Sequence, residues 1–254
     1  MSTFFYYLCH MINEVRNTVL SIISKDNRGY ITPEEFNQFA RQAQMELFEQ
    51  YFYDYSNNLN KTNARLHNSG YSDITGRLGE VIDRFVISKT LGFDGVSKEF
   101  YAPGDDNVND PKPYRILRLT YNGSKEIEKV SHTKILNLIS SNLTTPTISY
   151  PAYVINDYNS GAASIQVYPT TITSGVSALY VRHPFDPKWT WTSLSGGEPI
   201  FNQSASDYKD FELPLSDMPR LITLICKYSG VSIREADVVQ VMNSDEVLDI
   251  QQKN

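Results

Sequence analysis

Proline divides this chain into regions that can fold in different ways. Ten of its twelve prolines lie between residues 103 and 214, mixed with glycine and short runs of β-favouring residues. Proline lacks a backbone donor and disrupts the interior of a helix, so this stretch is not a helical bundle. On either side of it, apolar residues recur every three or four positions, which is the spacing of one helix face. The sequence therefore predicts an α+β fold with helices at both ends and a β-rich middle.

The N-terminal region, residues 11–92, is predicted to be helical. An apolar stripe predicts a first helix that ends near Ser24. A second helix should begin at Pro33, which suits the first helical position. Thr32 can cap the exposed amides of this helix, and Glu35 stands where a capping box requires an acid.

The helical pattern has gaps in this region. Residues 1–10 precede it and are expected to form an extension outside the fold, with translation beginning at Met11. The pattern is lost again in the polar residues that follow the aromatic run 51–55. It returns over residues 73–90, which predicts a third helix that stops before Gly92.

The middle region, residues 93–215, is predicted to be a small antiparallel sandwich or barrel. The pair Asn122-Gly123 between two strand-like runs is a strong hairpin signal. Residues 132–141 are interpreted as a short helix between strands. The predicted strands cover residues 114–121, 126–130, 150–155, 164–168 and 178–182, with a further one near 189–192.

The last region, residues 216–254, is predicted to be a helical pair that packs with the N-terminal helices. Its first helix follows Ser216 and should end at Gly230. Ser232 and Glu235 form another capping box, which predicts that a helix restarts there.

Charge and cysteine content exclude several function classes. The chain has 23 basic and 29 acidic residues, which give a net charge of −6 and a pI near 5.3. It also has no run of Lys and Arg, so no basic surface that binds nucleic acid is expected. Cys9 and Cys226 lie near opposite ends and form no metal spacing. The apolar run at residues 4–8 is far shorter than the ~20 residues that cross a bilayer, so no membrane partner is expected.

Residues 24–36 have the frame of a calcium-binding EF-hand loop, with Gly29 at the turn position and Glu35 at the bidentate position. The ligand set is deficient, because Ser24 and Arg28 stand where oxygen ligands are needed. Asp26 is explained as a turn residue and Glu35 as the capping-box acid. A helix-turn-helix is therefore favoured over a calcium site.

No constellation in the sequence predicts a catalytic, cofactor-binding or metal-binding residue, and no enzyme activity is expected. The isolated histidines belong to no metal or nucleophile pattern. The acidic pairs lie in turns, where they are expected to be solvated, although two carboxylates of a glycosidase could meet in space. The residues considered are His10, His67, His132, His183, Asp105, Asp106, Asp207, Asp210 and the loop Ser195-Gly196-Gly197.

Aromatic residues point instead to contacts with other proteins. Tyrosine supplies 17 of the 31 aromatic residues, and aromatic side chains are enriched at protein interfaces. The run 51–55 places aromatics on every face of its helix. Trp189 and Trp191 would share one face of a strand. Either group could also be core.

Several short motifs, taken in order, resemble a virion protein of crAss-like and related tailed bacteriophages. The resemblance covers nearly the whole chain from Met11, and none of its motifs is catalytic. The motifs are residues 15–19, 25–37 and 167–169, Tyr180 with His183-Pro184, and residues 187–189, 211–214 and 230–234.

The resemblance implies a structural protein of the head-to-tail connector or tail of a short-tailed virion, assembled in the host cytoplasm. It implies a homo-oligomeric ring, a dodecamer, that docks below the portal and contacts neighbouring tail or ring proteins. DNA would pass through the ring without specific binding, and no cofactor is implied. Two alternatives remain: a glycan-binding or glycan-cleaving tail module, suggested by Trp189 and Trp191, and a degenerate EF-hand regulator.

Overall fold

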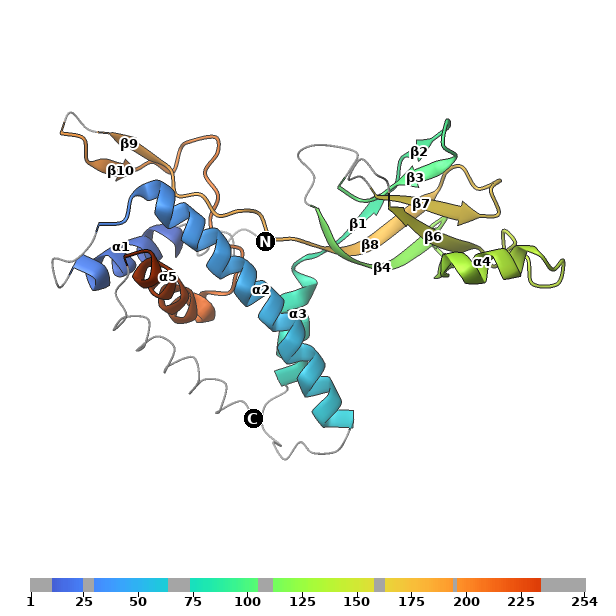
Figure 1. The fold of residues 1–254 in the computed structure, drawn as a ribbon, viewed down its shortest axis with the longest axis horizontal. Helices are drawn as coiled ribbons and strands as arrows, with labels where there is room; N and C mark the ends of the chain where they lie inside the picture. Colours follow the sequence, from blue (N-terminus) through green and yellow to red (C-terminus); the bar gives the residue numbers. More distant parts are fainter. Residues whose placement is uncertain are drawn as a thin grey trace. The chain divides into compact units, whose positions relative to one another are not determined.

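The computed structural model divides into two compact units, and each is described by itself. A helical unit takes Met1–Val81 and Pro184–Asn254, and a sheet unit takes Ile82–His183 (Figure 1). The structure describes residues 11–24, 30–63, 74–104, 112–157, 163–193 and 196–233. The expected α+β fold is confirmed.

The helical unit is built on α1 (Met11–Ser24), α2 (Pro33–Asn63) and α5 (Met218–Ile233), and a 3₁₀ turn, η1 (Leu215–Asp217), precedes α5. Helix α5 packs against both α1 and α2. Apolar side chains at helical spacing meet between the three helices and are fully buried. They include Ile12, Val15, Val19, Phe36, Ala40, Leu47, Leu221 and Ile225.

The predicted start of α2 is confirmed. The hydroxyl of Thr32 accepts a hydrogen bond from the Glu35 N–H at 3.2 Å, and the Thr32 N–H donates to the Glu35 carboxylate at 2.9 Å. This reciprocal capping box satisfies amides that have no partner within the helix.

Two helix ends were predicted too early. Helix α2 continues through residues 51–58 to Asn63, because Tyr51 is buried while polar residues such as Ser56 face solvent, which a helix surface tolerates. Helix α5 continues past Gly230 to Ile233. Gly230 is buried, so tertiary packing overrides its low helix propensity. The restarted helix predicted after Ser232 lies mostly outside the described residues.

The predicted third helix was wrong in its second half. Helix α3 (Ile74–Asp83) ends early, and β1 (Val86–Thr90) follows it. Val86 and Ile87 are β-branched, and β1 pairs antiparallel with β8 (Val176–Arg182). This pairing is non-local, so helical periodicity within the segment could not reveal it.

Eight strands form one sheet in the order β1-β8-β4-β5-β6-β7-β3-β2. All pairs are antiparallel except β5 with β6. Since β1 and β2 occupy opposite ends of this order but are joined by Leu91 and Gly92 alone, the sheet must curl back on itself. The remaining strands are β2 (Phe93–Asp94), β3 (Glu99–Tyr101), β4 (Pro113–Tyr121), β5 (Lys125–Lys129), β6 (Ala152–Asp157) and β7 (Ala163–Tyr168).

The core of the sheet unit lies inside this curl. Buried apolar side chains come from most strands around it, including Phe100, Leu119, Ile127, Tyr153, Ile165, Val176 and Tyr180. The predicted hairpin is confirmed: Asn122 and Gly123 have φ of 48° and 71° and join β4 to β5. The predicted short helix is also confirmed, as α4 (His132–Ile139).

Candidate functional site

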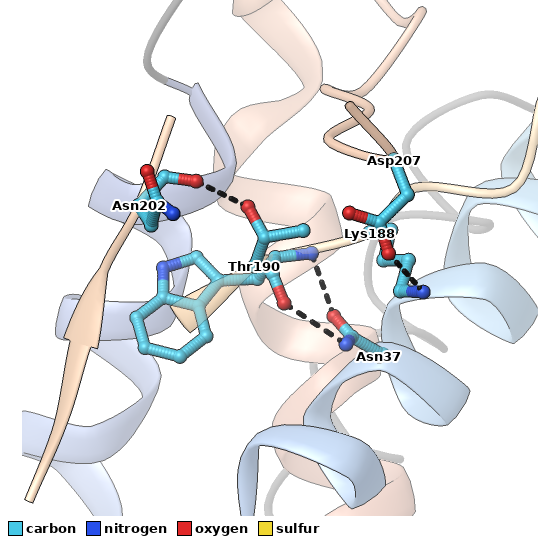
Figure 2. Close-up of polar contacts among 6 residues, drawn as sticks. Asn37, Lys188, Thr190, Asn202 and Asp207 are labelled. Atoms are coloured by element: carbon cyan, nitrogen blue, oxygen red, sulfur yellow. Dashed lines mark hydrogen bonds and ion pairs between the residues drawn. The ribbon is translucent and has the colours of Figure 1, made fainter. Parts of the chain in front are cut away.

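Trp189 stands at the centre of the polar and aromatic contacts of the helical unit. Its backbone N–H donates to the Asn37 side-chain oxygen at 2.8 Å, and its carbonyl accepts from the Asn37 amide at 3.1 Å (Figure 2). The neighbouring residue Thr190 donates from its hydroxyl to the Asn202 carbonyl. The side-chain amide of Asn37 on α2 thus pairs with this segment as a neighbouring strand would.

The Trp189 side chain belongs to the core, with 1% of its surface exposed. Trp191 and Phe201 stack near it, each with its ring centroid 5.9 Å from that of Trp189. These two residues come from a hairpin of β9 (Trp191–Ser193) and β10 (Pro199–Phe201). The two tryptophans do lie together as expected, but the face of Trp189 is not available to a ligand.

Arg16 of α1 covers the Trp189 ring, with its guanidinium carbon 3.8 Å from the ring centroid. Only 6% of Arg16 is exposed, and its Nε has no hydrogen-bond partner. Burial lowers the pKa of Arg16, while Tyr30 acts in the opposite direction. Contact with the π face of an indole partly compensates a buried cation.

The two aspartates of the turn before α5 have different roles. Asp207 is exposed and forms an ion pair with Lys188 at 2.6 Å, and this hydrogen bond lowers the pKa of Asp207 (Figure 2). Asp210 accepts hydrogen bonds from the backbone N–H groups of Met11 at 3.2 Å and Ile12 at 2.8 Å. It therefore caps α1, and burial raises its pKa. The expectation of a solvated turn acid was wrong for Asp210.

The other sequence candidates have structural environments or lie outside the described residues. Glu35 is held in the capping box. A ring nitrogen of His132 lies 3.0 Å from the Ile155 carbonyl oxygen, and burial raises the pKa of Cys226 to about 11. His183 packs edge-on against Tyr114. The candidates outside the described residues are Cys9, His10, Asp26, Arg28, Gly29, His67, Asp105, Asp106 and Ser195.

No group of three His, Cys, Asp or Glu side chains that could hold a metal occurs in the described part of the chain. The aromatic run 51–55 is divided between core and surface. Tyr51 is buried and donates to Asp217, and Phe52 packs on Phe48 with ring centroids 5.1 Å apart. Tyr53 is 68% exposed.

The sheet unit carries a group of exposed apolar side chains that the sequence reasoning missed. Helix α4 places Ile135 against Val130, Ala152 and Val154 in a small core. Among the exposed side chains on α4 and in the segment after it, five are large and apolar. We call these five residues the α4 surface: Leu136 (69% exposed), Ile139 (42%), Leu143 (94%), Ile148 (50%) and Tyr150 (83%).

The segment that carries the α4 surface is folded by its own hydrogen bonds. Ser131 caps α4 through the Lys134 N–H at 3.3 Å. After the helix, the Thr145 hydroxyl donates to the Ser141 carbonyl at 2.7 Å, and Thr147 and Tyr150 exchange backbone hydrogen bonds at 3.2 and 3.0 Å. The exposed side chains are therefore presented from a defined backbone.

A signal for this surface is present in the sequence. Residues 135–181 contain a single charged residue, Asp157, in a chain that is 20% charged. Depletion of charge together with exposed apolar residues is the compositional mark of an interface core. Searching for charge-free segments, as well as for aromatic runs, would have found the α4 surface.

No protein-family model matches this chain, and no curated protein shows significant similarity to it. Among the helices of the described residues, none has the length and apolar character that crossing a membrane requires.

Proposed function

We propose that this chain is a structural virion protein that forms a ring in the head-to-tail connector or tail of a short-tailed phage. It would dock below the portal, surround the DNA channel and act through assembly, without a reaction or a cofactor. The observation that carries the proposal is the α4 surface, because five large apolar side chains exposed within residues 136–150 are typical of a protein interaction site.

The polar candidates of the helical unit support this proposal. Asp210 caps a helix, Asp207 pairs with Lys188, and Asn37 holds the Trp189 backbone. These groups maintain the fold, and the α4 surface has no such structural role in the described contacts. The resemblance to crAss-like virion proteins points to the same kind of role.

The net charge of −6 also fits a channel protein. A basic lining would bind DNA by releasing counterions from its phosphates, and this would slow DNA that must slide. An acidic chain without basic runs suits transit of DNA better than binding.

The test is negative-stain microscopy and mass measurement of the purified chain, alone and mixed with the portal of its phage. We expect closed rings of one symmetry, free or on the portal. A monomer that remains unassociated in both samples would contradict the proposal.

One feature behind each alternative has a structural role in the fold. A glycan platform needs an accessible aromatic face, and Trp189 is 1% exposed. A calcium loop needs the Glu35 carboxylate, which already accepts two hydrogen bonds from Thr32. Isothermal titration with calcium and with host-surface glycans should show no binding, and micromolar binding of either would restore that alternative.

A further inference from the structure

We infer that the α4 surface is covered by a second copy of this chain. The inference rests on the proposed function, since it names the contact that would join neighbouring subunits of the ring. Three observations support the inference: the α4 surface is uncharged, the same chain has a second uncharged surface, and the α4 surface is large.

The partner of this surface must itself be uncharged. No charged residue occurs in residues 135–156, which include the whole α4 surface. A charge placed against these side chains would lose its hydration without gaining a partner, which is costly. Of the charges before this segment, Lys134 pairs with Glu128 at 3.2 Å, and the Lys125 ammonium donates to the Ile148 carbonyl at 3.4 Å.

A lipid or nucleic-acid partner does not fit this chemistry. Helices that lie on membranes combine an apolar face with many Lys and Arg residues. Phosphate binding likewise depends on cations. Between residues 136 and 149 the polar residues are Asn, Ser and Thr, which suits burial against another protein surface.

The chain carries a second exposed, uncharged surface that can meet the first. The turn between β7 and β8 exposes Thr170, Thr171, Thr173 and Ser174, all within the same low-charge stretch. A ring is closed by head-to-tail contacts, so each subunit must present two different complementary surfaces. The sheet unit offers two different exposed, uncharged surfaces on one chain.

The area is also of the right order. Five exposed side chains of this size present several hundred Å² of apolar surface, and each partner in a specific interface buries roughly 800 Å². The exposed Ser and Thr residues beside them would supply the polar rim that such interfaces have.

The first experiment compares assembly of two variants by mass photometry. Leu136→Ser with Leu143→Ser removes two apolar anchors from the α4 surface. Val96→Ser is the matched control, since Val96 and Leu143 are each 94% exposed in the same unit. We expect the double variant to associate at least about tenfold more weakly, for a loss of ~1.4 kcal/mol or more, and the control to assemble as the native chain does. Equal assembly of all three proteins would overturn the inference.

The second experiment identifies what covers the surface. Leu143→Cys in a Cys9→Ser background is labelled with benzophenone maleimide and irradiated in the assembled state, with and without the portal. Cys226 is buried, so the new thiol is the one that reacts. An adduct of two copies of this chain supports the inference, and an adduct with the portal alone, or none, overturns it.

The outcomes separate the inference from the proposed function. Rings that form normally but give no chain-to-chain adduct would overturn the inference and leave the ring proposal standing. A chain that forms no ring, alone or with the portal, would overturn both. Val96→Cys, labelled in the same way, should give no chain-to-chain adduct.

Discussion

The side chain of Asn37 hydrogen-bonds both backbone groups of Trp189, which lies 152 positions away in the sequence. A single amide on α2 thereby satisfies a donor and an acceptor in an irregular segment, next to the β-bridge between Lys188 and Lys209. A second amide on the same helix acts similarly, since Gln44 donates to the Phe185 carbonyl at 2.7 Å and accepts from the Glu212 N–H at 3.0 Å. These two side chains anchor the segment before α5 to α2.

Replacing Asn37 should therefore destabilise the helical unit. Asn37→Ala loses both hydrogen bonds, and we expect a loss of about 1–3 kcal/mol because the Trp189 backbone groups are left unpaired. Asn37→Asp should also be destabilising, since a carboxylate can accept from the Trp189 N–H but cannot donate to its carbonyl. Urea unfolding followed by tryptophan fluorescence measures this unit, because both tryptophans belong to it.

Gln38→Ala is the matched control for these variants. Gln38 is the next residue on α2 and is exposed. Surface substitutions usually change stability by less than about 0.5 kcal/mol. An Asn37→Ala variant as stable as Gln38→Ala would contradict the anchoring role.

Arg16 allows a test of how a buried cation is tolerated against an aromatic face. Arg16→Met keeps much of the side-chain volume and removes the charge, so the lost contact with Trp189 is offset by relief of the desolvation cost. We expect Arg16→Met to lie within about 1 kcal/mol of the native chain, and Arg16→Ala to lose about 2–3 kcal/mol because it opens space beside Trp189. Equal losses for the two variants in urea unfolding would show that packing contributes little here.

Local signals in the sequence predicted the elements that depend on local chemistry. The capping box of Thr32 and Glu35 and the turn at Asn122-Gly123 are confirmed, because each is determined by residues within a few positions of one another. Strand β1 was missed because its partner β8 lies about 90 positions later. The α-helical continuation past Gly230 likewise depends on burial that sequence patterns do not reveal.

The difference between local and distant contacts applies to the candidate-site residues as well. The proximity of the two tryptophans could be predicted from their alternation, but the burial of Trp189 could not, since it depends on Asn37 and Arg16 from distant helices. The role of Asp210 was missed because its partners, the first amides of α1, are 198 and 199 positions away. The α4 surface has a local signal in the sequence, which is the absence of charged residues. Aromatic content alone does not identify this surface.

Asp210 should give the helical unit a defined pH dependence. Burial raises its pKa above the ordinary 3.8, against the opposing effect of the N–H groups of Phe211, Ile12 and Met11. An acid with a raised pKa binds more protons in the folded state, so its contribution to stability falls as pH rises from the ordinary value through the folded value. Asp210→Asn does not ionise, and its stability relative to the native chain should therefore improve between about pH 3.5 and pH 7.

Asp210→Ala separates the capping role of this residue from its charge. The variant removes the acceptor of the Met11 and Ile12 amides. Since neither variant ionises at this position, Asp210→Ala should be ~0.5–2 kcal/mol less stable than Asp210→Asn at every pH. Urea unfolding at a series of pH values checks both variants. A pH-independent difference between Asp210→Asn and the native chain would contradict the raised pKa.

Gly175 and Gly123 form a matched pair for testing the turn region of the sheet unit. Both have positive φ, +77° and +71°, so alanine is strained by roughly 1–2 kcal/mol at either position. A Cβ at Gly175 would also lie 2.3 Å from the Asn122 side-chain oxygen, whereas at Gly123 it would meet nothing within 4 Å. The Asn122 N–H donates to the Gly175 carbonyl at 2.8 Å, which ties the two turns together.

We therefore expect Gly175→Ala to destabilise the sheet unit more than Gly123→Ala does. Adding Asn122→Gly to Gly175→Ala removes the clashing side chain, so the effect of the alanine should be smaller in that background. Thermal unfolding followed by far-UV circular dichroism is the appropriate measurement, since neither tryptophan belongs to this unit. If Gly175→Ala lowered the thermal stability equally with and without the Asn122 side chain, backbone strain alone would explain why glycine is needed at position 175.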